Sequence, residues 1–184
     1  ILTVACLLLF WALPLRPSDD TTFQLGGGFH VFLPASDPKE TALSEVTVLV
    51  GPTFMSRLTG KVDSVHHDLN FKMGILFGFL YTSRDLTIGI DNGTISDMIF
   101  PLLLCVQFER RGLYYETGLG IGIQSTKLTL SGTTSSHDRI SFVYSMGAGY
   151  VSEGFDLNGT MLFDYDGDNL SVVLLFTAGV SYDF

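Results

Sequence analysis

The chain has 184 residues with a formal net charge of −9, and 46% of its residues are hydrophobic while only 16% are charged. This length is typical of a single domain, and the negative charge argues against a nucleic-acid-binding protein, which needs a basic surface. An average soluble domain has roughly a quarter of its residues charged. Beyond the N-terminus no run of about 18 apolar residues predicts a membrane-spanning helix.

The opening stretch, ILTVACLLLFWALPL, has the length and composition of the apolar core of a secretory signal peptide. We expect a signal peptide over 1–18, truncated at its start and cleaved somewhere within residues 13–20, followed by one domain over 19–184. Removal of Cys6 would leave Cys105 as the last cysteine, so no intramolecular disulfide could form. An exported protein without disulfides is typical of the bacterial envelope.

From residue 22 onward, apolar residues recur at every second position. In LYYETGLGIGIQ, for example, Leu113, Leu119 and Ile121 alternate with Glu116 and three glycines. Such a period of two predicts β-strands, and each run is about as long as a transmembrane strand of ~9–11 residues. The pattern predicts eight strands, at 22–33, 45–56, 68–81, 97–108, 113–125, 139–151, 155–164 and 169–184.

Strand length and the polar face decide between a soluble and a membrane barrel. The strands are nearly equal in length, Lys and Arg are scarce within them, and the polar face is glycine-rich with single charges such as Lys72, Glu116 and Asp156. A narrow barrel interior accommodates such a face, whereas a soluble barrel would place many charges on its outer surface. We predict an all-β fold, an eight-stranded antiparallel up-and-down transmembrane β-barrel.

Parity sets the topology, because bacterial single-chain barrels have an even number of strands. A ninth strand-like piece, LTIGID at 86–91, is assigned to an external loop or a strand extension. A rival pairing omits 22–33 and counts 86–91 as a strand. The scheme predicts short periplasmic turns at 109–112 and 152–154, a longer one at 57–67, and external loops at 34–44, 82–96, 131–138 and 166–169.

Aromatic residues on the apolar rows gather near the strand ends, as in the girdles of membrane barrels. We expect Phe23, Phe108, Tyr115, Tyr150, Phe155, Tyr182 and Phe184 at the periplasmic rim. The outer rim would carry Tyr81, Phe100, Phe142, Phe163 and Tyr165.

Two stretches resemble a known family. VLLFTAGVSYDF, which ends at Phe184, resembles the terminal assembly signal of outer-membrane barrels, and MIFPLLLCVQFERRGLYYETGLGIGI resembles a hairpin of the small outer-membrane β-barrel domain family (outer-membrane protein A/X-like barrels). The resemblance implies a monomer in the outer membrane of a Gram-negative bacterium. Its implied partners are outer-membrane lipids, lipopolysaccharide and the barrel assembly machinery, which reads the strand ending at Phe184. The family includes structural barrels, adhesins, serum-resistance factors and a few lipid-modifying enzymes, so it implies no single activity.

Two polar clusters contain the residue types that nucleophilic catalysis needs: Ser64, His66, His67 and Asp68, and Ser136, His137 and Asp138. We interpret both as polar turn and loop residues, because adjacency in sequence does not bring such groups together. The His-x-Ser-Asn signature of small barrel lipid A deacylases does not occur. Neighbouring histidines on a strand point to opposite faces, which disfavours a metal site at His66 and His67.

The polar residues of the inward rows form a further group: Gln24, His30, Lys72, Asp97, Gln107, Glu109, Glu116, Gln124, Arg139, Asp156, Asn158 and Asp164. They could line a pore or form a packed, ion-paired core, and eight strands enclose a space that side chains nearly fill. The acids Asp91, Asp97, Asp164, Asp166 and Asp168 lack the spacing of a calcium-binding loop.

The sequence predicts no catalytic, cofactor-binding or metal-binding residue and no cofactor. We expect a structural, adhesive or interaction role through the external loops, without catalysis. Two alternatives remain: a lipid-modifying enzyme that uses His66 or His137 with a nearby serine, and a narrow channel for small solutes.

Overall fold

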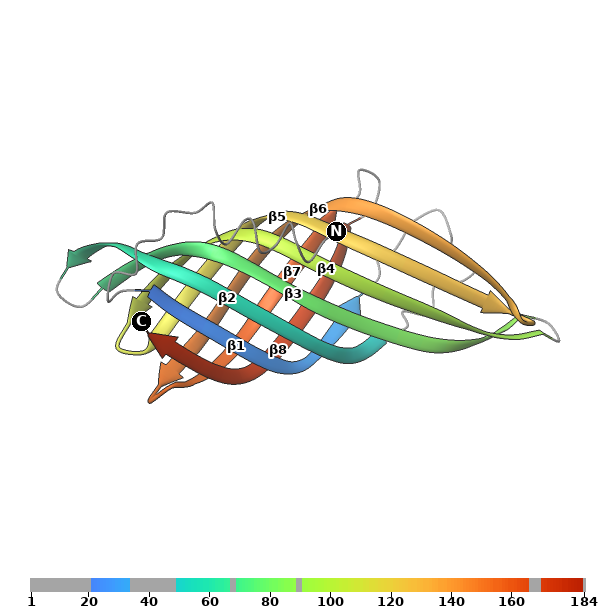
Figure 1. Ribbon diagram of the computed structural model, residues 1–184, viewed down its shortest axis with the longest axis horizontal. Helices are drawn as coiled ribbons and strands as arrows, with labels where there is room; N and C mark the ends of the chain where they lie inside the picture. The colour runs from blue at the N-terminus through green and yellow to red at the C-terminus, as the bar shows by residue number, and fades with distance from the viewer. Residues whose placement is uncertain (1–20, 34–48, 67–68, 89–90, 166–169, 184) are drawn as a thin grey trace.

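The computed structural model describes residues 21–33, 49–66, 69–88, 91–165 and 170–183, which form a closed barrel of antiparallel strands (Figure 1). The strands pair in chain order, and β8 closes the barrel against β1. Their bounds are β1 Thr21–Leu33, β2 Leu49–His66, β3 Leu69–Ile88, β4 Asp91–Arg110, β5 Leu113–Leu130, β6 Thr133–Ser152, β7 Phe155–Tyr165 and β8 Leu170–Asp183. The predicted eight-stranded up-and-down barrel is confirmed.

Several predictions lie outside the described residues, namely the signal peptide at 1–18, the loops at 34–44 and 166–169, and the terminal Phe184. Within the described part of the chain, no helix is long and apolar enough to cross a membrane.

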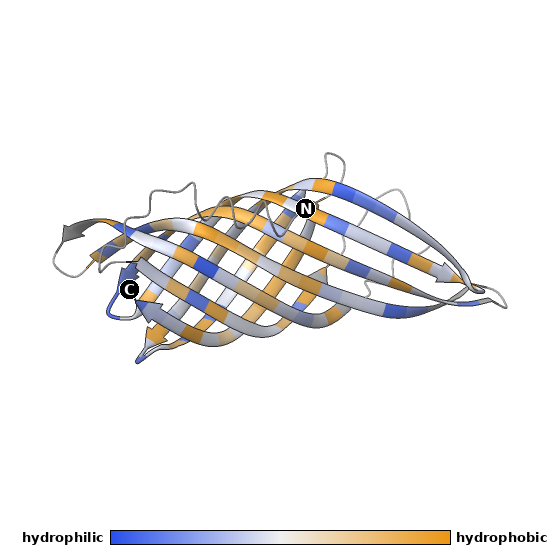
Figure 2. Ribbon diagram, in the orientation of Figure 1, coloured by the Kyte–Doolittle hydropathy of each residue, from blue (hydrophilic) through white to orange (hydrophobic). Residues whose placement is uncertain are grey.

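Hydrophilic and hydrophobic residues alternate along the strands (Figure 2), and polar residues such as Gln107 and Glu116 are buried in the interior. Large hydrophobic side chains on the outer face are widely exposed: Leu104 is 71% exposed, Leu119 50% and Phe142 47%. Exposed apolar surface on this scale would be unfavourable in water, but it is the expected contact surface for lipid. The exterior is therefore that of a membrane-spanning barrel.

The outward aromatic residues follow the predicted girdles. Of the residues predicted for the periplasmic rim, Phe108, Tyr115, Tyr150, Phe155 and Tyr182 are exposed on the outer face, and so are Phe100, Phe142 and Tyr165 of the outer rim. Neighbouring rings are in contact, for example Phe79 with Phe100, whose ring centroids lie 5.1 Å apart.

Three two-residue hairpin turns share one geometry. The turns Arg111–Gly112, Ser131–Gly132 and Glu153–Gly154 all have positive φ at both residues, between 47° and 83°. This is the type I′ geometry, whose twist matches that of the flanking strands and which favours glycine at its second position. The predicted short turns at 109–112 and 152–154 are confirmed. The turns Arg111–Gly112 and Glu153–Gly154 lie at the same end of the barrel as the C-terminal end of β8, whereas Ser131–Gly132 lies at the opposite end, where β5 and β6 are extended (Figure 1). Because such barrels have short turns in the periplasm and longer extensions outside, we assign the end with the first two turns to the periplasm.

The predicted turn at 57–67 is wrong, because β2 continues to His66 and pairs with β3 as far as His66 opposite Leu69. Register shifts occur between Lys61 and Asp63 and between Ser64 and His66. These irregularities break the period of two only beyond Lys61, so the pattern before them still continues the strand.

The predicted external loops at 82–96 and 131–138 are also wrong. β3 and β4 continue in register to Ile88 opposite Asp91, and β5 and β6 continue to Leu130 opposite Thr133. These extensions are rich in Ser, Thr and Asp and lack the apolar row that marks a membrane strand, but backbone hydrogen bonding holds them as strands. The piece at 86–91 is thus a strand extension, and the rival pairing without 22–33 is excluded by β1.

Glycines let the strands approach closely where the barrel closes between β1 and β8. A Cβ atom on Gly28 would lie 1.9 Å from the carbonyl oxygen of Phe176, and one on Gly179 would lie 1.9 Å from that of Leu25. No side chain fits at either distance. These two inward glycines are therefore required by the seam itself.

Candidate functional site

The interior of the barrel, its lumen, contains a cluster of buried charged residues. Toward the periplasmic end its centre is Arg57 on β2, whose side chain is 1% exposed. Arg57 Nε donates to both carboxylate oxygens of Glu116 on β5, at 2.9 and 3.1 Å. Its Nη1 lies 3.9 Å from the carboxylate of Asp156 on β7. One buried cation therefore faces two buried carboxylates across the lumen.

Hydrogen bonds extend this cluster toward β5 and β7. The hydroxyl of Tyr114 donates to Asp156 at 2.7 Å and accepts from the amide of Asn158 at 3.0 Å. Thr160 donates to the side-chain oxygen of Asn158 and accepts from Arg57 Nη2 at 3.4 Å. The Arg57 cluster thus joins three strands through charge-assisted bonds, the strongest class of hydrogen bond in proteins.

A second ion pair lies at the seam between β1 and β8. Lys72 Nζ contacts Glu109 at 2.8 Å and donates to the hydroxyl of Thr22 at 2.9 Å. Thr22 in turn donates to Asp183 at 2.6 Å. These bonds connect the first and last strands with β3 and β4.

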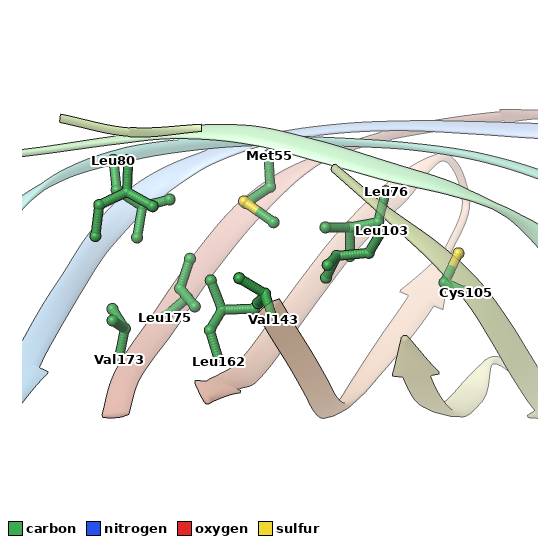
Figure 3. Close-up of a cluster of buried hydrophobic side chains, with 10 residues drawn as sticks. Met55, Leu76, Leu80, Leu103, Cys105, Val143, Leu162, Val173 and Leu175 are labelled. Carbon is green, nitrogen blue, oxygen red and sulfur yellow. The ribbon is translucent and has the colours of Figure 1, made fainter. Parts of the chain in front are cut away.

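The middle of the lumen is filled by apolar side chains (Figure 3). Leu76, Leu103 and Val143 are each at most 1% exposed. The complete cluster is Met55, Leu76, Leu80, Ile99, Leu103, Cys105, Val143, Leu162, Val173 and Leu175. An apolar layer of this kind is unfavourable for the passage of ions, which lose their hydration there.

Above this layer, toward the outer end, lies another polar group. Arg139 Nε donates to Gln124 at 2.7 Å, and its Nη2 lies 3.7 Å from the carboxylate of Asp164. Asp97 accepts hydrogen bonds from Gln124 and Thr126. Lys72 and Glu109, Arg139 and Asp164, and Glu116 and Asp156 around Arg57 thus form ion pairs inside the barrel, as in the packed core that was predicted as one of the two possibilities.

A small cavity near this outer group has a volume of only about 10 Å³. It is lined by His30, Leu80, Thr82, Asp97 and Ile99. This is room for about one water molecule, which needs a site of roughly 10–15 Å³. The cavity is too small for a substrate.

Of the two polar clusters considered for catalysis in the sequence, the one at 136–138 lies on a single strand. Ser136, His137 and Asp138 lie on β6, where successive side chains point to opposite faces, so His137 faces away from its two neighbours. Backbone positions are described for Ser64 and His66 at the end of β2, whereas residues 67–68 fall outside the description.

Acidic residues do not gather into a metal site in the described ranges, where no group of three or more His, Cys, Asp or Glu could hold an ion. Asp97 accepts a hydrogen bond from Thr126, and Asp164 forms an ion pair with Arg139. Asp166 and Asp168 lie outside the described residues.

Arg57, the centre of the polar cluster toward the periplasmic end, was not identified from the sequence because 57–67 was assigned to a turn. The signal was present, since Met55, Arg57 and Thr59 continue the inward period of two and all are at most 1% exposed. A polar or charged residue on that row is expected in a narrow lumen.

At the outer end of the barrel, four of the described strands continue beyond the apolar belt. β3, β4, β5 and β6 extend past the other strands as a four-stranded sheet, here called the protruding sheet, built from residues 82–88, 91–97, 125–130 and 133–139 (Figure 1). On its outer face the apolar row gives way to a polar row of cross-strand neighbours: Ser83, Ser96, Lys127 and Ser136. The change marks where the lipid-facing surface ends.

The other face of the protruding sheet continues the lumen side and is partly apolar. Ile95 and Leu128 are direct cross-strand partners, and Leu130 lies opposite Gly93. All three hydrophobic side chains are partly exposed. The protruding sheet is thus amphipathic, with a polar face and a partly apolar one.

Comparisons with known proteins support the fold. No protein-family model matches the sequence, and no match was found among curated proteins. Among solved structures, the chain is similar to Ail, the attachment invasion locus protein of Yersinia pestis, in complex with the heparin analogue sucrose octasulfate. The TM-score is 0.63 and the sequence identity 16%, and the alignment covers 89% of this chain and 99% of that one. It is also similar to Neisserial surface protein A, with a TM-score of 0.51, 13% identity and coverage of 91% and 98%. At these identities the likeness establishes a shared eight-stranded outer-membrane barrel fold.

Proposed function

We propose that this protein is a non-catalytic interaction protein of the bacterial outer membrane that binds a protein partner through its protruding sheet. The observation that carries the proposal is the continuation of β3 to β6 beyond the apolar belt, with Ile95, Leu128 and Leu130 partly exposed on one face. Hydrophobic side chains displayed outside the membrane are a cost in water unless a partner covers them.

The edge of the protruding sheet supports the same proposal. In the described part of the chain, β7 pairs with β6 from Ser152 up to Phe142, so the outermost part of β6 pairs through β5 alone. An edge of this kind presents unpaired backbone groups and readily accepts another strand.

The filled lumen argues against the channel alternative. The apolar layer around Leu76, Leu103 and Val143 and the Arg57 cluster both lie across the route that a solute would take. Transport would require both layers to rearrange.

The charges of the protruding sheet favour a protein over a polyanion. The similar structure of Ail contains a heparin analogue, which calls for a basic surface. In the present chain the two hairpins contain three cations, Arg84, Lys127 and Arg139, against four carboxylates, Asp85, Asp91, Asp97 and Asp138. A balance of this kind gives no net attraction for a sulfated sugar.

The test compares cells that display wild type, Leu128→Asp or Thr129→Asp, in a binding assay against immobilised extracellular-matrix and serum proteins. Leu128 and Thr129 are neighbours on opposite faces of β5, so the two variants add the same charge at the same height. We expect Leu128→Asp to abolish binding and Thr129→Asp to retain it. Absence of binding by wild-type cells, or equal loss in both variants, would contradict the proposal. A change in the lipid A mass spectrum on expression would instead support an enzyme.

A further inference from the structure

A groove on the lipid-facing wall has no role in the proposed function. It crosses the wall from Leu113 on β5 over β6, β7 and β8 to β1 and has a volume of about 750 Å³. Its floor consists of the small outward residues Gly27, Ala148, Gly159 and Ala178, which interrupt an exterior of large apolar side chains. A second groove of about 340 Å³ shares Ala148, Gly159 and Phe176 with it and extends it along the wall.

The small size of these residues is not required by the barrel. A Cβ atom on Gly159 would come no closer than 4.0 Å to Phe176, and one on Gly27 no closer than 4.0 Å to a backbone oxygen. The inward Gly28, in contrast, has no room at all. Glycine weakens a strand and offers no apolar contact to lipid, so its presence on this face costs stability that another occupant of the groove can offset.

A row of outward cross-strand partners connects the groove with a basic residue at the periplasmic rim. The row runs through Arg110, Leu113, Tyr150, Leu157, Ala178 and Gly27, each paired with the next. Arg110 is exposed and lies at the end of β4. From Leu113 to Gly27 the row crosses four strand spacings, about 19 Å at ~4.8 Å each. This length is comparable to the ~15 Å of hydrocarbon in one leaflet.

The charges at the periplasmic rim indicate which lipid headgroup could bind beside the groove. Arg110 is the cross-strand partner of Leu113, which lines the groove, and a backbone hydrogen bond from Val151 to Gly112 at 2.8 Å ties the adjoining turn to β6. Glu153 lies in the next turn of the same rim. Arginine pairs well with phosphate, and the neighbouring carboxylate suits a cationic amine while it opposes a headgroup of higher negative charge.

We propose that the groove is a binding site for one zwitterionic glycerophospholipid of the periplasmic leaflet. An acyl chain lies on Ala148, Gly159, Ala178 and Gly27, beneath the stacked rings of Phe29 and Phe176, whose centroids are 5.3 Å apart. The phosphate binds at Arg110, and the amine faces Glu153. The site is independent of the protruding sheet, so either proposal can fail alone.

Native mass spectrometry of the purified barrel tests the site. The protein in mild detergent receives equal amounts of phosphatidylethanolamine, phosphatidylglycerol and lipid A, and the bound lipid is counted at rising collision energy. We expect one phosphatidylethanolamine to remain on the wild type. Ala148→Leu with Gly159→Leu fills the groove and lowers the retained fraction at least fivefold, whereas Arg110→Gln lowers it about threefold.

Two controls separate the site from ordinary lipid contact. Leu104→Phe enlarges an exposed side chain on β4, outside the residues that line either groove, and Lys127→Gln removes a cation at the opposite end of the barrel. Neither is expected to change retention. Folding of each variant is checked by heat-modifiable gel mobility, and Ala178→Leu replaces the double variant if that variant does not fold.

Three results would overturn the proposal. Equal retention by wild type and groove-filled protein would mean non-specific lipid contact, and preference for lipid A would place the ligand in the other leaflet. A dimer that the groove-filling substitutions dissociate would identify the occupant as a second copy of the chain.

Discussion

Replacement of Arg57 tests how the interior is held together. In Arg57→Met the side chain keeps most of its apolar length, but Glu116 and Asp156 lose their shared cation. Both carboxylates belong to residues that are at most 1% exposed, so water does not replace the lost contacts. Removing one partner of a buried ion pair typically costs about 3–5 kcal/mol. An independent estimate agrees, since two unit charges at 4 Å interact by about 4 kcal/mol at an effective dielectric constant of 20.

The assay is urea-induced unfolding in lipid vesicles, followed by the difference in gel mobility between folded and unfolded protein. We expect Arg57→Met to lower the free energy of unfolding by about 3–5 kcal/mol. The double variant Arg57→Met with Glu116→Gln removes one of the two buried carboxylates that have lost their cation. Its free energy of unfolding should therefore be at least about 1 kcal/mol higher than that of Arg57→Met, within the usual range of coupling energies. Leu104→Met on the lipid face serves as control. A loss below about 1 kcal/mol in Arg57→Met, or a double variant no more stable than the single one, would refute the reasoning.

Two further predictions follow from the packed interior and the seam. The purified protein should give no single-channel conductance in planar bilayers, because the apolar cluster around Leu76 and Leu103 closes the lumen; regular current steps would contradict this. Gly28→Val should prevent formation of the heat-modifiable folded form, since its side chain would collide with the backbone of Phe176. The adjacent Gly27→Val, whose side chain points outward into open space, should still fold, and equal behaviour of the two variants would refute the assigned register.

The sequence predicted the membrane part of the barrel well because a lipid-facing strand must place an apolar side chain at every second position. The inward residues Lys72, Glu109 and Glu116 were identified for the same reason. Their partners were only partly predictable, because the pairing across the lumen depends on the strand register. Arg57 in particular was assigned to a turn and therefore had no predicted contact with Glu116.

The protruding sheet was not predicted, for a physical reason. Outside the membrane neither face needs an apolar row, so stretches such as the one from Thr133 to Asp138 look like loops in sequence. Their strand structure comes from continued pairing with β5 through backbone hydrogen bonds. Such bonds do not depend on the side chains, so the sequence pattern does not reveal them. The tight Ser131–Gly132 turn was the available clue, because a type I′ turn is typical of a two-residue hairpin.

The account depends most on the protruding sheet being paired strands, and spin labels at Lys127→Cys and Ser136→Cys test this directly. The two residues are direct cross-strand partners on β5 and β6, with Cβ atoms expected at about 4.5–5.5 Å. Electron paramagnetic resonance of the doubly labelled protein in lipid vesicles should show strong dipolar broadening and water-accessible labels. Sharp, unbroadened spectra from mobile labels would show a loop at this place and would contradict the protruding sheet.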